Sequence, residues 1–528
     1  MSSTPTATQR FIAAWFDDTF AGIHHLDWFD WTMMVPYFAV LLVLSCYGLH
    51  RYEMIRGYWK HRKKFTEVPP QRYAQLPRVT IQLPIYNEQY VVERLIEAAS
   101  KMEYPRELLE IQILDDSTDE THPFTAGLVE QYKAAGLPIE YIYRANRHGY
   151  KAGALQNGLQ TATGEIVVIF DADFIPPVDF LERVVHQFAD PKVGMVQTRW
   201  AYLNRHYNVL TEVQAMLLDG HFVLEHVARS GAGLFFNFNG TAGALRREMI
   251  DDAGGWQHDT LTEDSDLSYR AQLKGWKFVY LPSIECPSEL PVETYGFQVQ
   301  QSRWAKGLTQ VAMKLLPKIL KSDLPWRVKA EAFFHLTPNI SYPLMIIVSA
   351  LMLPVMIVRF YQGWLQMLLI DVPLIAASFW SISAFYVIAH RELYPKTWKR
   401  AFLFLPALMA AGVALTIINS RAVFEALIGY QTGFARTPKY AIGGQKVQIQ
   451  NIQYRRRSGW LPYAELAVGT YFMGMVVFAI ESYNFLAIPF LLLFVGGYYW
   501  AGCTTLWEEY QGRLAWERQQ ALAFESSK

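Results

Sequence analysis

Apolar segments of membrane length flank a long polar block, and this layout restricts the chain to folds that join a membrane bundle to an extramembrane domain. Residues 33–50 read MMVPYFAVLLVLSCYGLH, close to the roughly 20 residues that a helix needs to cross a ~30 Å hydrocarbon core. A basic run begins at Arg51, whereas Arg10 is the only arginine or lysine before it. This asymmetry predicts a transmembrane helix whose C-terminal end faces the cytoplasm.

Apolar character returns after residue 325. The candidate spans there are residues 341–360, 366–390, 401–419, 465–482 and 485–506. We expect the basic loops 391–400 and 420–460 on the cytoplasmic side, so residues 401–419 between them are expected to be interfacial or re-entrant. The N-terminus lacks a signal-peptide pattern. An uncleaved, multi-pass protein of the inner (plasma) membrane, with its polar block in the cytoplasm, is therefore predicted.

Bulk composition narrows the classes of partner and of cysteine site that the chain is expected to have. Lys+Arg and Asp+Glu both number 48, so no excess charge indicates nucleic acid. Cys46, Cys286 and Cys503 have neither metal-type spacing nor a disulfide framework.

The polar block alternates strand and helix patterns. Short apolar runs at 79–83, 111–114 and 166–170 are typical of buried parallel strands. Helical patterns at 91–102, 125–135 and 151–160 separate them. This alternation predicts an open α/β sheet, in which ligands bind at the carboxyl ends of the strands.

Acidic clusters follow two of these strands. Alternation places Asp171 and Asp173 of the Asp-Ala-Asp motif on one side, where they can hold Mg²⁺ or Mn²⁺ on a substrate diphosphate. The Asp115-Asp116 pair would place one carboxylate near the nucleoside of a bound donor. The structural alternatives are a turn or a helix cap.

A basic, glycine-containing stretch opens the helix at 151–160. It contains Arg144, Arg147, Tyr150, Lys151 and Gly153. Backbone N–H groups and a lysine at a helix start suit a phosphate, and a solvated loop is the alternative.

Two further motifs lie later in the block. Thr262-Glu263-Asp264-Ser265-Asp266 is expected to start a helix with Thr262 as N-cap, and a first-turn acid is stabilised there by the helix dipole alone. Asp264 is also our candidate general base. In the expected helix 300–307, Arg303 can bind diphosphate and Trp304 can cover a sugar ring. Its alternative is an interfacial helix with a tryptophan anchor.

In this order, the motifs resemble the pattern D, DxD, TED and QxxRW of the family 2 processive β-glycosyltransferases of the cellulose synthase superfamily. The similarity runs from residue 83 to Gly307 and continues into residues 434–439, FARTPK, which resemble the family's FxVTxK gating loop. Arg436 stands where that loop has valine. Segments 197–200, 238–243 and 289–291 look like the cellulose-synthase-like A branch of glucomannan 4-β-mannosyltransferases, in a bacterial-type form.

The resemblance implies a GT-A (Rossmann-like) α/β domain inserted between α-helical transmembrane segments. It further implies inverting transfer from GDP-mannose or UDP-glucose to a growing glycan, with Mg²⁺ or Mn²⁺ as cofactor. A second copy or a secretion partner is a further candidate partner. By match, the site comprises the catalytic residues Asp264 and Glu263, the donor-binding residues Glu88, Asp115, Asp116, Lys151, Asp171, Gln300 and Arg303, the metal ligands Asp171 and Asp173, the acceptor-binding residues Asn239, Gln301 and Trp304, and the gating residues Phe434, Thr437 and Lys439. The trailing Ser-Thr-Asp favours Asp116 over Asp115 for the family's first aspartate.

The predicted domain order follows from these motifs and spans. It is an interfacial segment (1–30), a transmembrane helix (31–52), the GT-A domain (53–325), interfacial and transmembrane helices (326–420), a cytoplasmic gating-type loop (421–462), two transmembrane helices (463–508) and a cytoplasmic tail (509–528).

Three functions are compatible with this order. The first is polymerisation of a β-1,4-linked mannan, glucomannan or glucan with export of the product. The second is a non-processive enzyme that adds one sugar to a lipid such as diacylglycerol. A transporter or scaffold with an inactive domain is the third, and the intact set of Asp173, Asp264 and Arg303 disfavours it.

Overall fold

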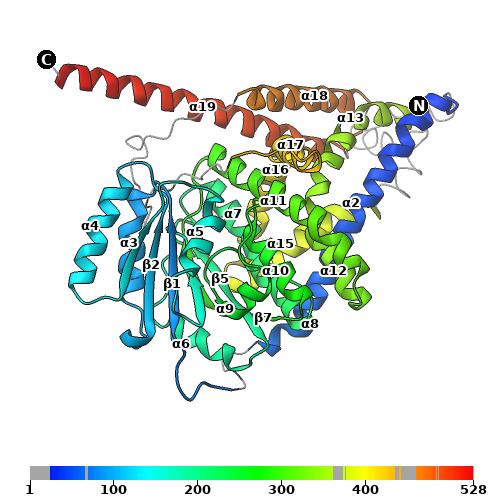
Figure 1. Cartoon of the computed structure of the whole chain (residues 1–528). Helices are drawn as coiled ribbons and strands as arrows, with labels where there is room; N and C mark the ends of the chain where they lie inside the picture. Colours follow the sequence, from blue (N-terminus) through cyan, green and yellow to red (C-terminus); the bar gives the residue numbers. More distant parts are fainter. Residues whose placement is uncertain are drawn as a thin grey trace, which may run out of the picture. The chain divides into compact units, whose positions relative to one another are not determined.

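The computed structural model describes residues 24–65, 69, 71–360, 373–374, 376–433, 439, 441, 459–482, 484–485 and 487–526. The chain divides into two compact units (Figure 1). The helical unit comprises residues 1–53, 338–424 and 453–528, and the α/β unit comprises residues 54–337 and 425–452. The segments predicted at 1–30 and 421–462 lie in large part outside the described residues.

A seven-stranded mixed sheet, in the order β3-β2-β1-β4-β6-β5-β7, forms the centre of the α/β unit. Neighbouring strands are parallel except that β6 runs antiparallel to both β4 and β5. The strands are β1 (Val79–Ile85), β2 (Leu109–Asp115), β3 (Ile139–Tyr143), β4 (Ile166–Ile169), β5 (Val193–Tyr202), β6 (Gly243–Arg246) and β7 (Lys277–Ser288).

The helices of this unit connect the strands and extend beyond the last one. They are α3 (Gln89–Ser100), α4 (Thr121–Ala134), α5 (Tyr150–Leu159), α6 (Phe180–Val185), α7 (Val209–Asp219), the π-helical η4 (Gly220–Glu225), α8 (His226–Ala232), α9 (Arg247–Asp252), α10 (Glu263–Leu273), α11 (Thr294–Lys321) and α12 (Trp326–Leu336). Short 3-10 turns are η1 (Arg62–Lys64), η2 (Arg106–Leu108) and η3 (His186–Ala189).

The strands predicted from apolar runs are confirmed as β1, β2 and β4, and the three predicted helices as α3, α4 and α5. Their parallel pairing is also confirmed. The antiparallel β6 was not predicted, because a strand of four residues has no periodicity long enough to detect.

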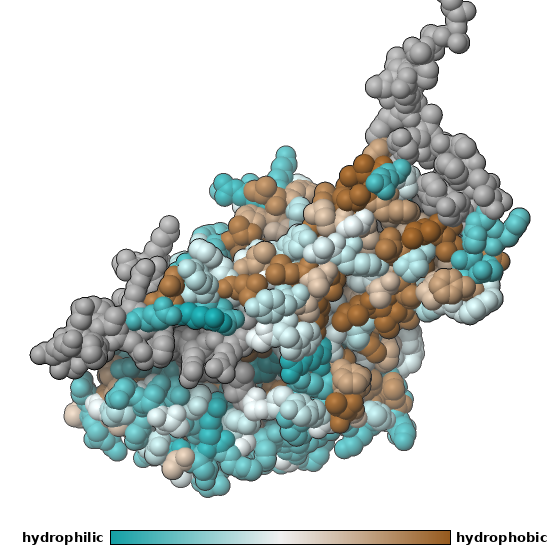
Figure 2. Space-filling model, turned by 90° about the horizontal axis from the view of Figure 1, so that it is seen from above, coloured by the Kyte–Doolittle hydropathy of each residue, from teal (hydrophilic) through white to brown (hydrophobic). Residues whose placement is uncertain are grey.

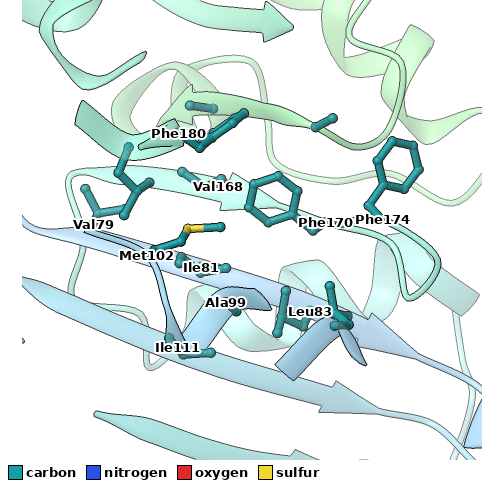
Figure 3. Close-up of a cluster of buried hydrophobic side chains, with 14 of the residues drawn as sticks. Val79, Ile81, Leu83, Ala99, Met102, Ile111, Val168, Phe170, Phe174 and Phe180 are labelled. Carbon is teal, nitrogen blue, oxygen red and sulfur yellow. The ribbon is translucent and has the colours of Figure 1, made fainter. Parts of the chain in front are cut away.

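One face of the sheet carries an apolar core. Alternate residues of β1, including Ile81 and Leu83, point toward α3 and meet side chains such as Ala99 and Phe180 (Figure 3). This follows from the two-residue repeat of a strand, which directs every second side chain to the same face. The core anchors the strand ends that carry the acidic motifs.

The other face of β1 and β2 is polar where α5 crosses it. Gln82 Nε2 donates to Gln112 Oε1 at 3.1 Å, and both side chains are fully buried. A Cβ added to Gly158 of α5 would lie 2.6 Å from Gln82 Nε2. A glycine is therefore needed here so that α5, which begins at the predicted phosphate-binding stretch, can lie close to the sheet.

The second unit is a bundle of apolar helices. Besides the first part of α2 (Trp28–His61), it contains η5 (Pro338–Ile340), α13 (Ser341–Phe360), the π-helical η6 (Ala376–Trp380), α15 (Ser381–Leu393), η7 (Trp398–Arg400), α16 (Ala401–Ala414), α17 (Thr416–Leu427), α18 (Leu461–Glu481) and α19 (Ile488–Ser526). Its interior is mostly apolar and includes stacked Phe472, Phe494 and Tyr498.

Among the described residues, four helical stretches are long and apolar enough to span a membrane: Trp28–Lys64, Pro338–Arg359, Leu461–Glu481 and Ile488–Leu514. They coincide with four of the predicted spans. Large apolar side chains on these helices are exposed, and Figure 2 shows hydrophobic residues gathered over part of the viewed face. Such a surface suits lipid rather than water.

Two predicted spans have a different status. In the predicted span 366–390, residues 366–372 and 375 lie outside the described residues, and α15 covers the end of the span. In the 401–419 region, Trp398–Ala414 and Thr416–Leu427 meet at a bend of 40°, as in a broken span or a re-entrant loop. The expected interfacial or re-entrant role stays a prediction.

Small residues let the apolar helices approach each other closely, which is a common way of packing membrane helices. A Cβ added to Gly497 of α19 would lie 2.6 Å from the carbonyl oxygen of Ala410 and 2.9 Å from Val413 Cβ, both on α16. For the adjacent Gly496, no described atom lies within 4 Å of such a Cβ.

These adjacent glycines give a matched test of helix packing. Gly497→Ala is expected to destabilise the bundle by about 1–3 kcal/mol, because backbone and Cβ atoms of α16 would have to move. Gly496→Ala should be neutral or stabilising by up to about 1 kcal/mol, since alanine favours the helix. Thermal unfolding of both variants in detergent checks this, and equal melting temperatures would contradict the close α16–α19 contact.

Candidate functional site

A single pocket of the α/β unit collects residues from all four predicted motifs. It forms beyond the carboxyl ends of β1, β2 and β4, as expected for ligands of such sheets. The predicted site residues that line it are Glu88, Asp116, Lys151, Asp171, Asp173, Asn239, Glu263, Asp264, Gln300, Arg303, Trp304 and Lys439.

Two lysines neutralise the carboxylates that follow β4. Lys151 Nζ lies 2.5 Å from Asp171 Oδ1, and Lys439 Nζ lies 2.6 Å from Asp173 Oδ1 and 2.9 Å from Glu88 Oε1. Burial opposes the charge of Lys439, but Asp173 and Glu88 raise its pKa above the ordinary value. The position between these carboxylates is therefore one that attracts a cation.

The oxygen donors in this part of the pocket fit a hard divalent cation. Within the described part of the chain, no group of three or more His, Cys, Asp or Glu side chains encloses a metal by itself. Asp171 and Asp173 instead suit an ion that completes its shell with water and substrate phosphate, as Mg²⁺ commonly does. Lys439 would have to leave Asp173 for an ion to reach that oxygen.

The structure separates the roles of two adjacent aspartates. Asp115 is fully buried, where its Oδ1 accepts from the Ser117 N–H at 2.8 Å and its Oδ2 from the Tyr141 hydroxyl at 2.5 Å. Asp116 lines the pocket and pairs with Arg144 Nε and Nη2 at 2.8 and 2.5 Å. Burial raises the pKa of Asp116, and Arg144 opposes this shift. Asp116 is thus the member of the pair that can meet a ligand.

Asp264 lies in the first turn of α10, next to Glu263. Burial and the neighbouring Glu263 carboxylate raise the pKa of Asp264 to about 7, against the hydrogen bond from the Ser265 N–H. A carboxylate tuned in this way can accept a proton near neutral pH. Gly240 passes so close that an added Cβ would lie 2.9 Å from Asp264 Oδ2.

The expected N-cap is only partly correct. Thr262 does occupy the N-cap position of α10, but its side chain makes no capping hydrogen bond. Its hydroxyl has no hydrogen-bond partner in the described part of the chain. Gly307 of α11 packs against this N-cap, because a Cβ there would lie 2.8 Å from both the Thr262 amide nitrogen and its Oγ1.

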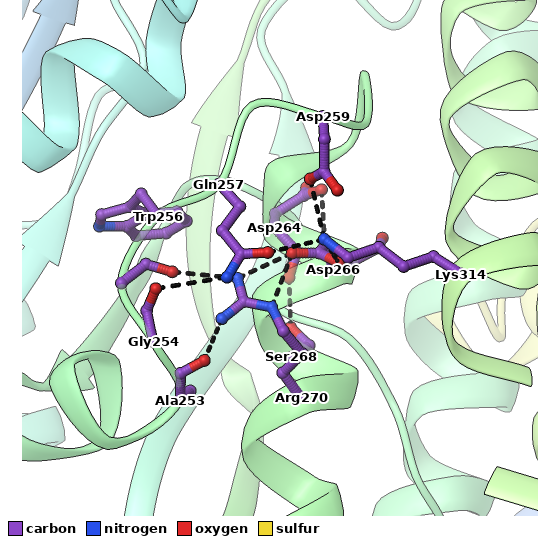
Figure 4. Close-up of polar contacts among 12 residues, drawn as sticks. Ala253, Gly254, Trp256, Gln257, Asp259, Asp264, Asp266, Ser268, Arg270 and Lys314 are labelled. Atoms are coloured by element: carbon purple, nitrogen blue, oxygen red, sulfur yellow. Dashed lines mark hydrogen bonds and ion pairs between the residues drawn. The ribbon is translucent and has the colours of Figure 1, made fainter. Parts of the chain in front are cut away.

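A buried ion-pair cluster behind Asp264 joins α10 to α11. Asp266 is fully buried, accepts a hydrogen bond from Arg270 Nε at 2.7 Å, and forms an ion pair with Lys314, whose Nζ lies 2.8 Å from Asp266 Oδ1. Lys314 also bonds Gln257 and Asp259 (Figure 4). Asp266 thus ties the helix carrying Asp264 to the helix carrying Arg303.

Helix geometry determines which residues of the last motif face the pocket. Gln300, Arg303 and Trp304 recur at spacings of three and four along α11 and line the pocket together. Gln301, predicted to bind the acceptor, is not among the lining residues, since one residue along an α-helix turns the side chain by about 100°. Arg303 is placed to balance Glu263 and Asp171, although burial lowers its pKa.

Lys306 was not predicted, although it belongs to the same motif. Its buried ammonium bonds Glu425 and Thr432, each at 2.9 Å. It thereby attaches the start of the gating-type segment to α11. Of the predicted gating residues, Lys439 reaches the pocket, whereas Phe434 and Thr437 lie outside the described residues.

Several other lining residues escaped prediction as site residues. Trp200, Glu289 and Tyr86 contribute to the pocket. Arg147, from the predicted phosphate-binding stretch, also lines it, and its guanidinium lies 3.3 Å from the centre of the Tyr86 ring. Trp200 and Glu289 belong to segments that resemble the branch-specific pattern, which was the signal available for them.

The Gly307–Thr262 contact can be tested by itself. Gly307→Ala is expected to lower the unfolding free energy by about 1–3 kcal/mol, because the added methyl group meets backbone atoms that cannot easily move. Gly127→Ala in α4, where no described atom lies within 4 Å of the added Cβ, is the matched control. Chemical denaturation of both variants checks the difference, and a stable Gly307→Ala protein would show that α10 and α11 are not in such close contact.

Comparison with known proteins matches this unit to an enzyme family. Residues 77–307 match the family model described as Glycosyltransferase like family 2. The chain is similar to the probable glucomannan 4-beta-mannosyltransferase 7 of Oryza sativa subsp. japonica, with 40% identity over 306 residues, 53% of this chain and 52% of the rice protein. Glucomannan 4-beta-mannosyltransferase 2 of Arabidopsis thaliana is 40% identical over 283 residues, 51% of this chain and 52% of that protein.

The chain spans about half the length of these curated relatives. Among solved structures, it is similar to the mannosyltransferase PcManGT from Pyrobaculum calidifontis in complex with GDP-Man and Mn²⁺. The identity is 25% and the TM-score 0.47, and the match covers 66% of this chain and 99% of that chain.

The predicted resemblance is confirmed for the polar block, because residues 77–307 match the glycosyltransferase family 2-like model. Its mixed α/β sheet agrees with the predicted GT-A class. Helices long and apolar enough to span a membrane precede and follow this domain in the chain.

Proposed function

We propose that the chain is a membrane-embedded, inverting hexosyltransferase that polymerises a β-1,4-linked mannan, glucomannan or glucan and extrudes it across the membrane. The family 2 domain and the glucomannan mannosyltransferases to which the chain is similar support hexosyl transfer. The same relatives favour a polysaccharide product over a single-sugar lipid, and a mannosyl over a glucosyl donor.

The observation that carries this proposal is the meeting of four separate motifs in one pocket. Asp116, Asp173, Asp264 and Arg303 come from distant parts of the sequence and all line it. A nucleotide-sugar transferase needs a group for the nucleoside, carboxylates for a metal, a base, and a cation for the diphosphate. The pocket holds a candidate for each of them, and Trp304 offers a flat apolar surface that suits a sugar ring.

Donor binding would use the charged groups at the strand ends. Asp116 accepts from the nucleoside, and Arg303 and Lys151 bind the diphosphate by charge-assisted hydrogen bonds. Asp171 and Asp173 would hold Mg²⁺ or Mn²⁺, which supplies Lewis-acid neutralisation of the leaving diphosphate when bound. Lys439 exchanges its bonds with Glu88 and Asp173 for a phosphate contact.

Sugar transfer then requires one proton acceptor. Asp264 takes the proton of the acceptor hydroxyl while that oxygen bonds to the anomeric carbon of the donor sugar. The bond from this carbon to the diphosphate breaks on the opposite side, and its electron pair leaves with the nucleoside diphosphate. A single displacement of this kind inverts the anomeric carbon, and Asp264 is left protonated until it releases the proton to solvent.

The helical unit suits the export step. We propose that its apolar helices anchor the α/β unit in the inner (plasma) membrane with the catalytic pocket in the cytoplasm. The domain order predicted from the sequence, and a homo-oligomer or a secretion partner, belong to the same proposal. The basic run after residue 50 supports the orientation.

Turnover by purified protein tests the function. In lipid nanodiscs with Mg²⁺ or Mn²⁺, GDP-mannose or UDP-glucose should be consumed, with release of nucleoside diphosphate and formation of a polymer that a β-1,4-specific glycanase cleaves. Asp264→Asn should reduce transfer by at least about 10²-fold, because the base is removed, while donor binding persists. A chloroform-soluble single-sugar lipid as the sole product would contradict polymerisation.

The pH dependence of turnover tests the role of Asp264. The base must be ionised, and its pKa is raised to about 7. We therefore expect kcat/KM to increase with pH up to about 7, and to fall about tenfold per unit below it. A steady-state profile from pH 5.5 to 8.5 with saturating metal checks this, with nucleotide binding at each pH as control. A flat profile across this range would exclude Asp264 as the base.

A further inference from the structure

Asn239 is held at the pocket wall by two histidines. It lies in the loop between α8 and β6, directly before Gly240, which approaches Asp264. His226 Nε2 lies 2.6 Å from Asn239 Oδ1, and Asn239 Nδ2 lies 3.0 Å from His221 Nε2. No family motif includes either histidine.

The hydrogen-bond direction is fixed at the His221 end. His221 Nδ1 lies 3.0 Å from Glu225 Oε2, and a carboxylate can only accept, so His221 carries a ring proton on Nδ1. Its Nε2 is therefore the ring nitrogen left to accept. Only the amide nitrogen of Asn239 can donate to it, which fixes the orientation of the amide.

The His226 end requires the same orientation independently. His226 is fully buried, and its Nδ1 has no hydrogen-bond partner among the described residues. Burial, with nearby His221, lowers the pKa of His226 well below its ordinary value, so the ring is neutral. Its one proton is best placed on Nε2, because a proton on Nδ1 would be a buried donor without an acceptor. His226 therefore donates, and the carbonyl oxygen of Asn239 accepts.

The network is anchored on both sides. Behind it, buried Arg229 donates to Glu225 at 2.9 Å and to Glu331 of α12 at 2.8 Å. In front, the backbone N–H of Asn239 donates to Gln197 Oε1 at 2.9 Å. Asn239 consequently has little freedom to turn its amide over.

One donor of this amide is left over. The amide nitrogen carries two hydrogens, and His221 accepts one. The other has no partner among the described residues, although Asn239 lines the pocket. A donor at a pocket wall, fixed beside a general base, is suited to a hydroxyl oxygen of a sugar.

We infer that His221 and His226 are positioning residues that hold Asn239 as an N–H donor to a hydroxyl of the acceptor sugar next to Asp264. This inference rests on the proposed function and deepens it. The acceptor hydroxyl that loses its proton points to Asp264, and the N–H of Asn239 binds a neighbouring hydroxyl oxygen on the same sugar. Asp264 and Asn239 together would set which face of the acceptor sugar is turned toward the donor.

The test compares variants that keep or remove this donor. Asn239→Asp is nearly isosteric but has no N–H, and we expect it to raise the KM for an added β-1,4-linked manno-oligosaccharide about tenfold or more, as for a lost hydrogen bond near charge. Nucleotide-sugar affinity, measured by calorimetry, should stay within about twofold. His221→Phe should raise the acceptor KM likewise, whereas His221→Gln should restore it, because a glutamine can accept from Asn239 and donate to Glu225.

His335→Phe is the matched control for a buried histidine. His335 bonds the Tyr269 hydroxyl at 2.6 Å and does not line the pocket. The His335→Phe substitution should lower the melting temperature without changing the acceptor KM. Calorimetric binding of the oligosaccharide without donor gives the same comparison independently of turnover.

The outcomes distinguish a failure of the proposed function from a failure of the positioning role of the histidines. No transfer by the wild type with any nucleotide sugar would overturn the proposed function. Transfer by the wild type, with unchanged acceptor KM and oligosaccharide affinity in a folded Asn239→Asp protein, would overturn the inference alone. Equal effects of His221→Phe and His221→Gln would also overturn the positioning role.

Discussion

Charge balance in one pocket is the constraint on which the rest of the α/β unit depends. Asp171, Asp173 and Glu88 would repel one another at close range if no cations were present. Lys151 and Lys439 bond them directly, and Arg303 lies near enough to be influenced by Asp171 and Glu263. The cations come from α5, α11 and the gating-type segment, so the arrangement holds only if these elements stay together. A phosphorylated donor with its metal would change this balance, which makes the pocket responsive to its ligand.

The sheet and its helices place these groups by simple geometry. Parallel strands β1, β2 and β4 end at the same edge and deliver Glu88, Asp116 and the Asp171/Asp173 pair there. Glycines allow the close contacts that follow: Gly158 under the sheet, and Gly307 against Thr262. Buried ion pairs then fix the helices, which agrees with a role in specifying position more than in adding stability.

Much of this site could be predicted because its residues follow strong patterns. Strand alternation put Asp171 and Asp173 together, and the order of the motifs identified Asp264 and Arg303. The trailing Ser-Thr-Asp already favoured Asp116 over Asp115, but the physical reason is the contact of Asp115 with Tyr141 of β3, which joins two strands and which no local pattern contains. The helical repeat alone could have shown that Gln301 points away from Gln300 and Trp304, and so does not belong to the predicted acceptor site. His221 and His226 had no signal, because their partner Asn239 comes from a separate loop and only the tertiary fold joins them.

Helix α11 carries three different tasks on neighbouring turns. Arg303 faces the pocket, Lys306 holds the start of the gating-type segment, and Lys314 holds Asp266 behind the candidate base. A small rotation of this helix would disturb all three at once, so these positions cannot be optimised one at a time. A redesign of this pocket for a different ligand would do better to exchange the helix together with its contacts on α10 and residues 425–432, as one module.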